Sequence, residues 1–256
     1  MKIAITGKGG VGKSTLAGIL CRIYATQGYK VLAVDADPDA NLANALGCLP
    51  EISSNIKPIS HLRELINDRM GIKVDKSFFK LNPKVDDLLD KYSIECFENL
   101  KLVVMGEVKK GGAGCYCPEN TFLKNFFSHI LIDQKDIMIM DMEAGIEHLS
   151  RGTASFVDAI VVVVEPGQRS IQTAKSILKL SYDIGISKIY LVGNKIFRKD
   201  QICLINNSFV GVKLIGSIFY DQEISILEQE GNSLFDSNLP IIKEVDNIRL
   251  FLEDII

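Results

Sequence analysis

Short apolar runs alternate along the chain with longer segments in which apolar residues recur every three or four positions. The short runs are rich in β-branched residues, which is typical of buried strands. They occupy residues 2–6, 30–34, 99–105, 137–141, 159–164, 188–194 and 213–219. The helical spacing occurs at residues 14–27, 61–70, 85–92, 170–183 and 239–256, and again after Pro118. This alternation predicts an α/β fold with a mostly parallel, doubly wound sheet covered by helices on both faces.

The periodic pattern is weaker between about residue 49 and residue 99, where Pro50, Pro58 and Pro83 interrupt it. We expect this segment to be an insertion on the core. The chain has 256 residues, of which 47% are hydrophobic and 24% charged, enough for one large α/β domain over residues 1–256.

Nine residues near the start of the chain, from Gly7 to Thr15, read G-K-G-G-V-G-K-S-T and match the phosphate-binding pattern G-x-x-x-x-G-K-[ST]. They connect a predicted strand to a predicted helix, the context in which this loop binds ATP or ADP. We expect Lys13 to lie between the β- and γ-phosphates and Ser14 to give its hydroxyl to Mg²⁺. The residues expected to contact the nucleotide are Gly9, Gly10, Val11, Gly12, Lys13, Ser14 and Thr15.

Carboxylates follow two of the other predicted strands. Asp35, Asp37 and Asp39 come after the strand at residues 30–34, and Asp141 ends the strand at residues 137–141. A carboxylate at a strand end can hold Mg²⁺ through water or orient a water beside the γ-phosphate. Asp35 and Asp39 could equally be solvated loop acids.

Net charge, the length of the apolar runs and the cysteine content indicate which partners and which cellular compartment the protein has. The formal charge of −3 gives no support for a nucleic-acid partner, and the longest apolar run, residues 159–164, is too short for a membrane span. We therefore expect a cytoplasmic protein without a membrane partner. The six cysteines predict reduced thiols, with Cys21 and Cys203 as core or near-core residues of helices.

Lys8 adds a second cation to the loop, and the whole loop resembles the deviant Walker A motif of the ATPase class that includes ParA, MinD and the nitrogenase iron protein. The resemblance implies an ATP-promoted homodimer in which Lys8 reaches the phosphates of the partner. It places Asp37 in the first switch and Asp141 in the second, supporting Mg²⁺ through water. It also suggests that Asn194 contacts the adenine, although this could be an ordinary asparagine at the end of a strand.

Cys115 and Cys117 lie in a glycine-rich loop at about residues 106–118, directly before the helix that Pro118 is expected to start. Lys109, Lys110 and the helix N-terminus should favour thiolate at Cys117. Two thiolates leave Ni²⁺ or Zn²⁺ short of four ligands, which a two-fold dimer could complete. The alternative is a pair of incidental loop cysteines.

The sequence around this pair resembles that of CooC-type ATPases, which mature nickel carbon monoxide dehydrogenase. The similarity includes residues 105–112 (M-G-E-V-K-K-G-G), 81–86 (L-N-P-K-V-D) and 141–153 (D-M-E-A-G-I-E-H-L-S-R-G-T), and covers most of the chain. It implies an ATPase that holds nickel at Cys115 and Cys117 and delivers it to a client nickel-iron-sulfur enzyme. A close relative serves acetyl-CoA synthase, and these residues do not separate the two clients.

Three other functions are less consistent with the sequence. An iron-protein-like electron donor would have a cluster cysteine after the second switch, where residues 146–149 are I-E-H-L. Residues 247–256 carry one cation and two acids, unlike the basic terminal helix of a MinD-like membrane protein. A ParA-like DNA partner is not supported by the charge balance. His148 is expected to pack or hydrogen-bond locally rather than bind metal.

Overall fold

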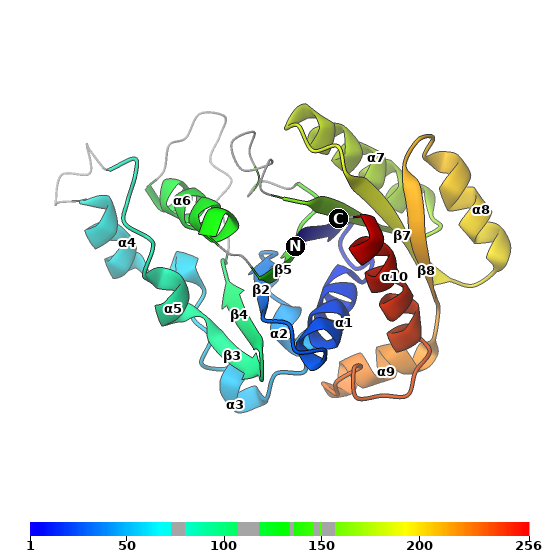
Figure 1. The fold of residues 1–256 in the computed structure, drawn as a ribbon, viewed down its shortest axis with the longest axis horizontal. Helices are drawn as coiled ribbons and strands as arrows, with labels where there is room; N and C mark the ends of the chain where they lie inside the picture. Colours follow the sequence, from blue (N-terminus) through cyan, green and yellow to red (C-terminus); the bar gives the residue numbers. More distant parts are fainter. Residues whose placement is uncertain (73–79, 107–117, 134–135, 146–148, 150–156, 256) are drawn as a thin grey trace.

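The computed structural model describes residues 1–72, 80–106, 118–133, 136–145, 149 and 157–255, and these residues form an eight-stranded sheet (Figure 1). The strand order is β3-β4-β2-β5-β1-β6-β7-β8. The strands are β1 (Lys2–Gly7), β2 (Val31–Ala36), β3 (Ile94–Phe97), β4 (Leu100–Val104), β5 (Ile137–Met142), β6 (Ala159–Val164), β7 (Ile189–Ile196) and β8 (Lys213–Phe219). All neighbours are parallel except β3 and β4. The predicted doubly wound α/β fold is confirmed.

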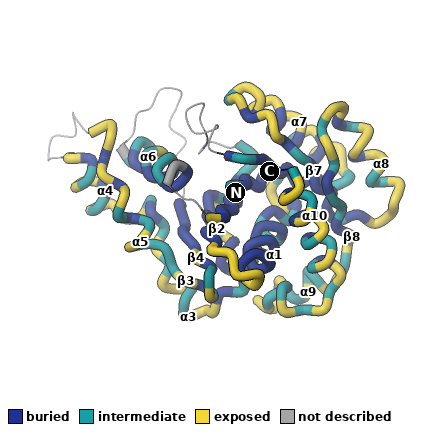
Figure 2. The backbone as a smooth tube through the Cα atoms, viewed as in Figure 1, coloured by how far each residue is buried: buried dark blue, intermediate teal, exposed yellow. Residues whose placement is uncertain are grey.

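Helices cover both faces of this sheet. On one face lie α1 (Lys13–Thr26), α2 (Leu42–Leu46) and α10 (Ile241–Ile255). On the other lie α4 (Arg63–Met70), α5 (Leu88–Tyr92), α6 (Pro118–Asp133), α7 (Gln168–Asp183) and α8 (Lys199–Ser208). The remaining described helices are α3 (Pro50–Ser53), η1 (Ile59–His61) and α9 (Gln222–Glu230). Figure 2 shows that burial is concentrated in the strands and in α1.

Alternate residues of each central strand face opposite layers. Ile3 and Ile5 pack with α1 and α10, whereas Ala4 packs with the helices of the other face. Because both faces are buried, the strands read as continuous apolar runs rather than as alternating ones. The strands nearest the centre of the sheet were therefore found from sequence to within two residues at either end.

The carboxyl ends of β1, β2, β5, β6 and β7 meet at one edge of the sheet because these strands are parallel. Two loops lie at this edge: the glycine loop between β1 and α1 (residues 8–12) and the acidic loop between β2 and α2 (residues 37–41). In open parallel sheets, ligands bind at such an edge.

The segment at 49–99 contributes β3, an antiparallel strand that extends the sheet, and α9 was not predicted. Two predictions about the cysteines need correction. Cys48 and Cys96 form a disulfide, in place of the expected reduced thiols. Cys21 is buried as predicted, but Cys203 is exposed because it lies on the outer side of α8.

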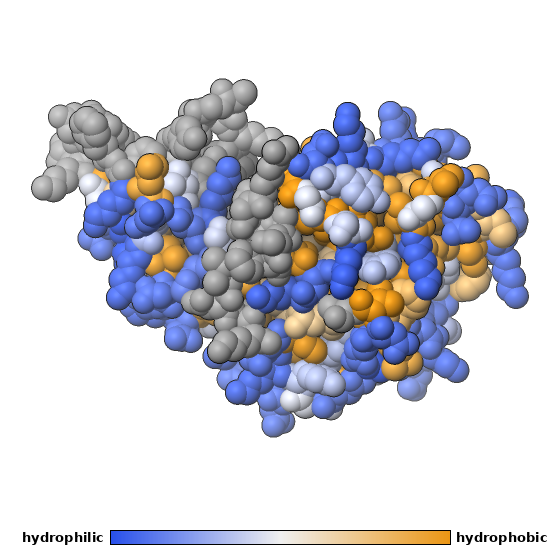
Figure 3. Space-filling model, turned by 45° about the horizontal axis from the view of Figure 1, so that its top comes forward, coloured by the Kyte–Doolittle hydropathy of each residue, from blue (hydrophilic) through white to orange (hydrophobic). Residues whose placement is uncertain are grey.

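The surface combines hydrophilic residues with smaller hydrophobic areas. On the face shown in Figure 3, hydrophobic residues occur in patches interspersed with hydrophilic ones. In the part of the chain that the structure describes, no helix has the length and apolar character needed to cross a membrane.

Candidate nucleotide-binding site

The loop between β1 and α1 has the backbone shape that its glycines permit. Gly10 and Gly12 have positive φ values of 76° and 90°. At Gly12 a Cβ atom would also stand 2.3 Å from the Asn194 side-chain nitrogen, so only glycine fits beside β7. Lys8 is partly exposed on this loop, and its carbonyl accepts a hydrogen bond from the Val11 N–H at 3.3 Å.

Lys13 begins α1 and forms an ion pair with the acidic loop after β2. Its Nζ lies 3.3 Å from Asp37 Oδ2, and the side chains are 6% and 15% exposed. The cation is therefore held at the mouth of the glycine loop. A bound phosphate would compete with Asp37 for this cation.

Ser14 follows Lys13 and donates a hydrogen bond to Oδ2 of Asp141 at the end of β5. The other carboxylate oxygen of Asp141, Oδ1, is buried and accepts no hydrogen bond within the described residues. A buried carboxylate oxygen without a hydrogen-bond partner destabilises the folded protein. Together with a neighbouring hydroxyl, it is well suited to a hydrated divalent cation. The hydroxyl of Ser14 and the free carboxylate oxygen of Asp141 therefore have the chemistry that Mg²⁺ needs.

Asp35 and Asp141 are paired in register on the neighbouring strands β2 and β5, and both are fully buried. Burial raises the pKa of Asp35 to about 7, opposed by hydrogen bonds from the N–H groups of Leu42 and Asp37. Burial likewise raises the pKa of Asp141 to about 6, and the Ser14 hydrogen bond and the Lys13 charge oppose this shift. Asp35 is thus a buried structural acid near the end of β2 rather than a solvated loop acid, whereas Asp39 is exposed.

Asn194 lies near the end of β7 with only 8% of its surface exposed. Its Nδ2 donates to the Val11 carbonyl at 2.7 Å, and its Oδ1 accepts from the Lys195 N–H at 2.8 Å. The side chain fastens the glycine loop to β7 and also lines a small cavity of about 110 Å³. This position is compatible with a contact to the base.

A larger cavity of about 640 Å³ lies between the glycine loop, the acidic loop and the end of α9. Both cavities are bordered by Glu228 of α9, whose Oε1 accepts a hydrogen bond from Thr15 Oγ1 at 2.7 Å. Sequence reasoning missed this residue because α9 carries no motif and lies 213 positions after Thr15. Only folding brings the two together.

The predicted metal loop lies outside the described residues, including Cys115, Cys117, Lys109 and Lys110, and so does His148. Among the residues that are described, no group of three or more histidine, cysteine or acidic side chains is arranged to hold a metal ion. Nickel or zinc binding at Cys115 and Cys117 therefore stays a prediction.

A phosphate-binding loop between β1 and α1, with Asp37 and Asp141 at the ends of adjacent parallel strands, defines a P-loop nucleotide-binding protein. Residues 2–234 match the family model described as the CobQ/CobB/MinD/ParA nucleotide binding domain. The chain belongs to this family, as an ATPase of its deviant Walker A class, and to the CooC-type group within it.

Two sequence relatives support this assignment. The carbon monoxide dehydrogenase accessory protein CooC of Rhodospirillum rubrum is 44% identical over 92% of this chain and 90% of its own length. An uncharacterised ATP-binding protein of Methanocaldococcus jannaschii is 40% identical over 97% of this chain and 96% of its own length.

Solved structures share the fold at low sequence identity. A ParA family ATPase of Chlorobium tepidum superposes with a TM-score of 0.70 at 20% identity, over 97% of this chain and 98% of the other. The MinD cell division protein of Aquifex aeolicus gives 0.66 at 19% identity, over 99% and 98%.

Proposed function

We propose that this protein is a maturation ATPase that uses ATP to deliver nickel to a carbon monoxide dehydrogenase. The observation that carries the proposal is the 44% identity, over 92% of the chain, with the carbon monoxide dehydrogenase accessory protein of Rhodospirillum rubrum. Nickel is the cargo of this reaction, and the proposed place of action is the cytoplasm.

The arrangement of the described side chains supports ATP binding and hydrolysis at the carboxyl edge of the sheet. Lys13 binds the β- and γ-phosphates once Asp37 releases it, and Ser14 with Asp141 holds Mg²⁺. Mg²⁺ would neutralise charge that develops on the phosphates. Asp37 then orients the attacking water, and Asn194 contacts the adenine. Each of these groups is within a few ångströms of the glycine loop.

The cargo site is proposed to need two copies of the chain. Cys115 and Cys117 of each copy supply two thiolates, and the two pairs together give a four-sulfur site for Ni²⁺ or, in its place, Zn²⁺. ATP promotes this dimer because Lys8 of one copy binds the phosphates held by the other. Hydrolysis separates the pairs again and releases nickel to the client.

The test is the nickel content and CO oxidation activity of carbon monoxide dehydrogenase produced at limiting nickel with each variant of this protein. Lys13→Ala and the double variant Cys115→Ala, Cys117→Ala should each lower both by about tenfold or more, because ATP or nickel is no longer bound. Cys203→Ala, an exposed cysteine on α8, is the matched control and should leave both unchanged. Added nickel should restore activity.

Full client activity with the double cysteine variant would exclude the cargo site. Full activity with Lys13→Ala would exclude ATP-driven delivery. The nickel content of acetyl-CoA synthase is measured in parallel. If this protein raises the nickel content of acetyl-CoA synthase but not that of carbon monoxide dehydrogenase, the client assignment is wrong while the ATPase role stands.

A further inference from the structure

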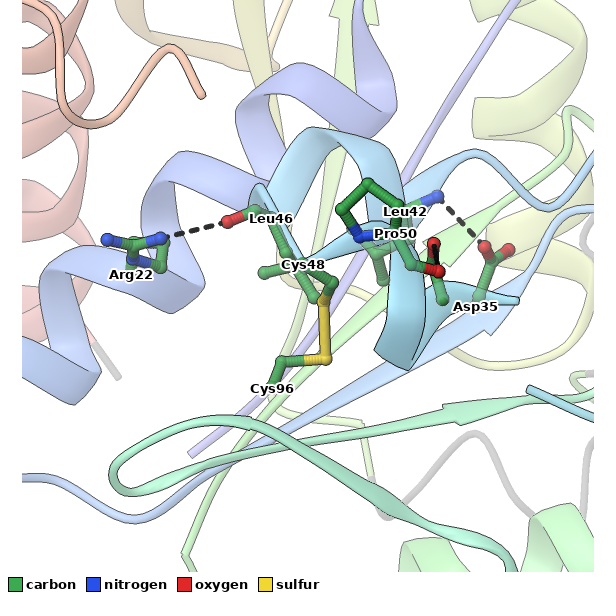
Figure 4. Close-up of a disulfide and its surroundings, with 8 residues drawn as sticks. Arg22, Asp35, Leu42, Leu46, Cys48, Pro50 and Cys96 are labelled. Atoms are coloured by element: carbon green, nitrogen blue, oxygen red, sulfur yellow. Dashed lines mark hydrogen bonds between the residues drawn. A yellow bond between two sulfur atoms is a disulfide. The ribbon is translucent and has the colours of Figure 1, made fainter. Parts of the chain in front are cut away.

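Cys48 and Cys96 are joined by a disulfide that spans 48 positions of the chain, with 5.4 Å between their Cα atoms (Figure 4). Cys48 follows α2 after one residue, and Cys96 lies on the edge strand β3. Both are nearly buried, at 8% and 7% exposure, in the apolar layer that contains α1. The bridge therefore ties the end of α2 to the edge of the sheet.

The other end of α2 is tied to the acidic loop. Asp35 Oδ2 accepts from the Leu42 N–H at 2.9 Å, where α2 begins, and Asp35 Oδ1 accepts from the Asp37 N–H at 3.2 Å. Figure 4 shows Asp35 and the bridge at opposite ends of this helix. The helix has five residues, so only about one and a half helical turns separate the disulfide from the acidic loop that holds Lys13.

Side chains of α1 reinforce the hold on the end of α2. Arg22 donates to the Leu46 carbonyl at 3.0 Å, and its guanidinium lies 3.6 Å from the centroid of the Phe97 ring, next to Cys96. At Gly18 a Cβ atom would stand 2.6 Å from the Ala45 carbonyl oxygen, so α1 and α2 are in backbone contact. With the bridge closed, α2 is fixed against α1 and against β3.

We propose that Cys48 and Cys96 are a thiol–disulfide exchange site that controls how far the segment from Asp37 to Cys48 can move when nucleotide binds. The proposal rests on the proposed ATPase function, in which Asp37 must release Lys13. The closed bridge restrains the segment and slows hydrolysis. When the bridge is opened to a dithiol, α2 keeps its hydrogen bonds with Asp35 and Arg22 but is no longer tied to β3. The segment from Asp37 to Cys48 can then move further.

The co-reactant is a dithiol, either a small molecule or a thioredoxin-like protein. One of its thiolates attacks the sulfur of one cysteine, which forms a mixed disulfide and releases the other cysteine as a thiolate. Its second thiol then attacks the mixed disulfide and displaces the first cysteine. Two electrons and two protons pass to Cys48 and Cys96, and the dithiol leaves as a disulfide. Intracellular thiols are usually kept reduced, so the closed bridge would report a more oxidising state.

The experiment compares oxidised and reduced protein in a Cys115→Ala, Cys117→Ala, Cys203→Ala background, which removes the other cysteines except the buried Cys21. Oxidised glutathione closes the bridge and dithiothreitol opens it, with closure measured by mass. We expect ATP hydrolysis to be about fivefold or more slower in the oxidised form. ADP affinity should change less than twofold, since the glycine loop itself is not restrained.

Adding Cys48→Ser and Cys96→Ser to this background should make hydrolysis independent of redox state. Hydrogen exchange of peptides covering residues 37–48 is the second readout, because it does not depend on turnover or on the variants. Exchange should be faster in the reduced form. Equal exchange and equal hydrolysis in the two redox states would overturn the proposal.

Failure of the ATPase assignment gives a different result. In that case neither redox form would bind ADP or hydrolyse ATP. A difference in exchange at residues 37–48 would then still support control of the segment by the bridge, and equal exchange would refute it.

Discussion

Asp35 and Asp141 show how burial changes the role of a residue at the scale of a single side chain. The sequence left open whether Asp35 was a solvated loop acid. The structure buries it completely beside Asp141, and it accepts hydrogen bonds from the backbone N–H groups of Asp37 and of Leu42, where α2 begins. No local pattern distinguishes it from the exposed Asp39, because burial depends on the neighbouring strands.

The raised pKa values predict a pH-dependent stability of the nucleotide-free protein. In the folded protein Asp35 has a pKa of about 7 and Asp141 one of about 6, both well above the ordinary range of an aspartate. Their stabilising contribution is fully present below about pH 4 and is lost as pH rises through these folded values, since the folded state binds the protons more tightly. The free energy of unfolding should therefore fall by a few kcal/mol between pH 5 and pH 8.

Urea denaturation in the presence of a chelator, at pH steps from 5 to 8, measures this dependence. Asp35→Asn should flatten the slope because the amide does not titrate. Asp200→Asn is the control, since Asp200 is exposed and its pKa is lowered rather than raised. An unchanged slope in Asp35→Asn would show that this carboxyl group does not titrate in the range.

Arg22 acts at the scale of elements, because one guanidinium joins four segments. It extends from α1 and donates to the Leu46 carbonyl at the end of α2. Its guanidinium carbon lies 3.6 Å from the ring centroid of Phe97 on β3 and 4.7 Å from that of Phe235, in the segment before α10. A planar guanidinium can stack on two rings and donate from its edge, which an ammonium group cannot do. Sequence reasoning placed Arg22 only on a predicted helix.

Arg22→Lys should lower the free energy of unfolding by about 1–3 kcal/mol, because the stacking and one buried hydrogen bond are lost. The matched control is Arg198→Lys, whose side chain is 72% exposed against 9% for Arg22. It should change stability by about 0.5 kcal/mol or less. Chemical denaturation measures the free energy of unfolding of both variants. Equal decreases in the two variants would show that the stacked arrangement contributes little to stability.

Element prediction succeeded where burial pattern and length agreed. The strands β5, β6 and β8 and the helices α7 and α10 were found to within about two residues, because their apolar spacing is unambiguous. In α9 only Ile224 and Leu227 share an apolar face, Ile226 is exposed, and none of the three is fully buried, so the helical pattern is too short to recognise. β3 has four residues and gains its stability from pairing with β4.

The whole molecule is proposed to act as a dimer, and Lys8 provides the test. It is partly exposed on the glycine loop, where a second copy could bring its phosphates. Lys8→Ala should bind ADP with wild-type affinity, because Lys13 and the loop backbone remain in place. It should fail to dimerise with a non-hydrolysable ATP analogue, and hydrolysis should fall at least tenfold.

Light scattering with and without the analogue measures the dimer. Lys84→Ala, a lysine whose side chain is 70% exposed in the segment before α5, is the control and should dimerise normally. An analogue-dependent dimer of Lys8→Ala would mean that this lysine does not act across the interface.

The sequence by itself determined the fold class, the glycine loop and the candidate acids, because these depend on residues close together in the chain. The pattern G-x-x-x-x-G-K-[ST] needs only consecutive residues between a strand and a helix, and strand ends can be read from apolar runs. The expected positions of Lys13, Ser14 and Asp141 all follow from such local information.

Only the tertiary structure decided the order of the strands, the burial of Asp35, and the meetings of Thr15 with Glu228 and of Cys48 with Cys96. These contacts join segments separated by 48 to 213 positions. Their partners are chosen by how the two apolar faces of the sheet are covered, which is a property of the packed chain and leaves no local pattern in the sequence.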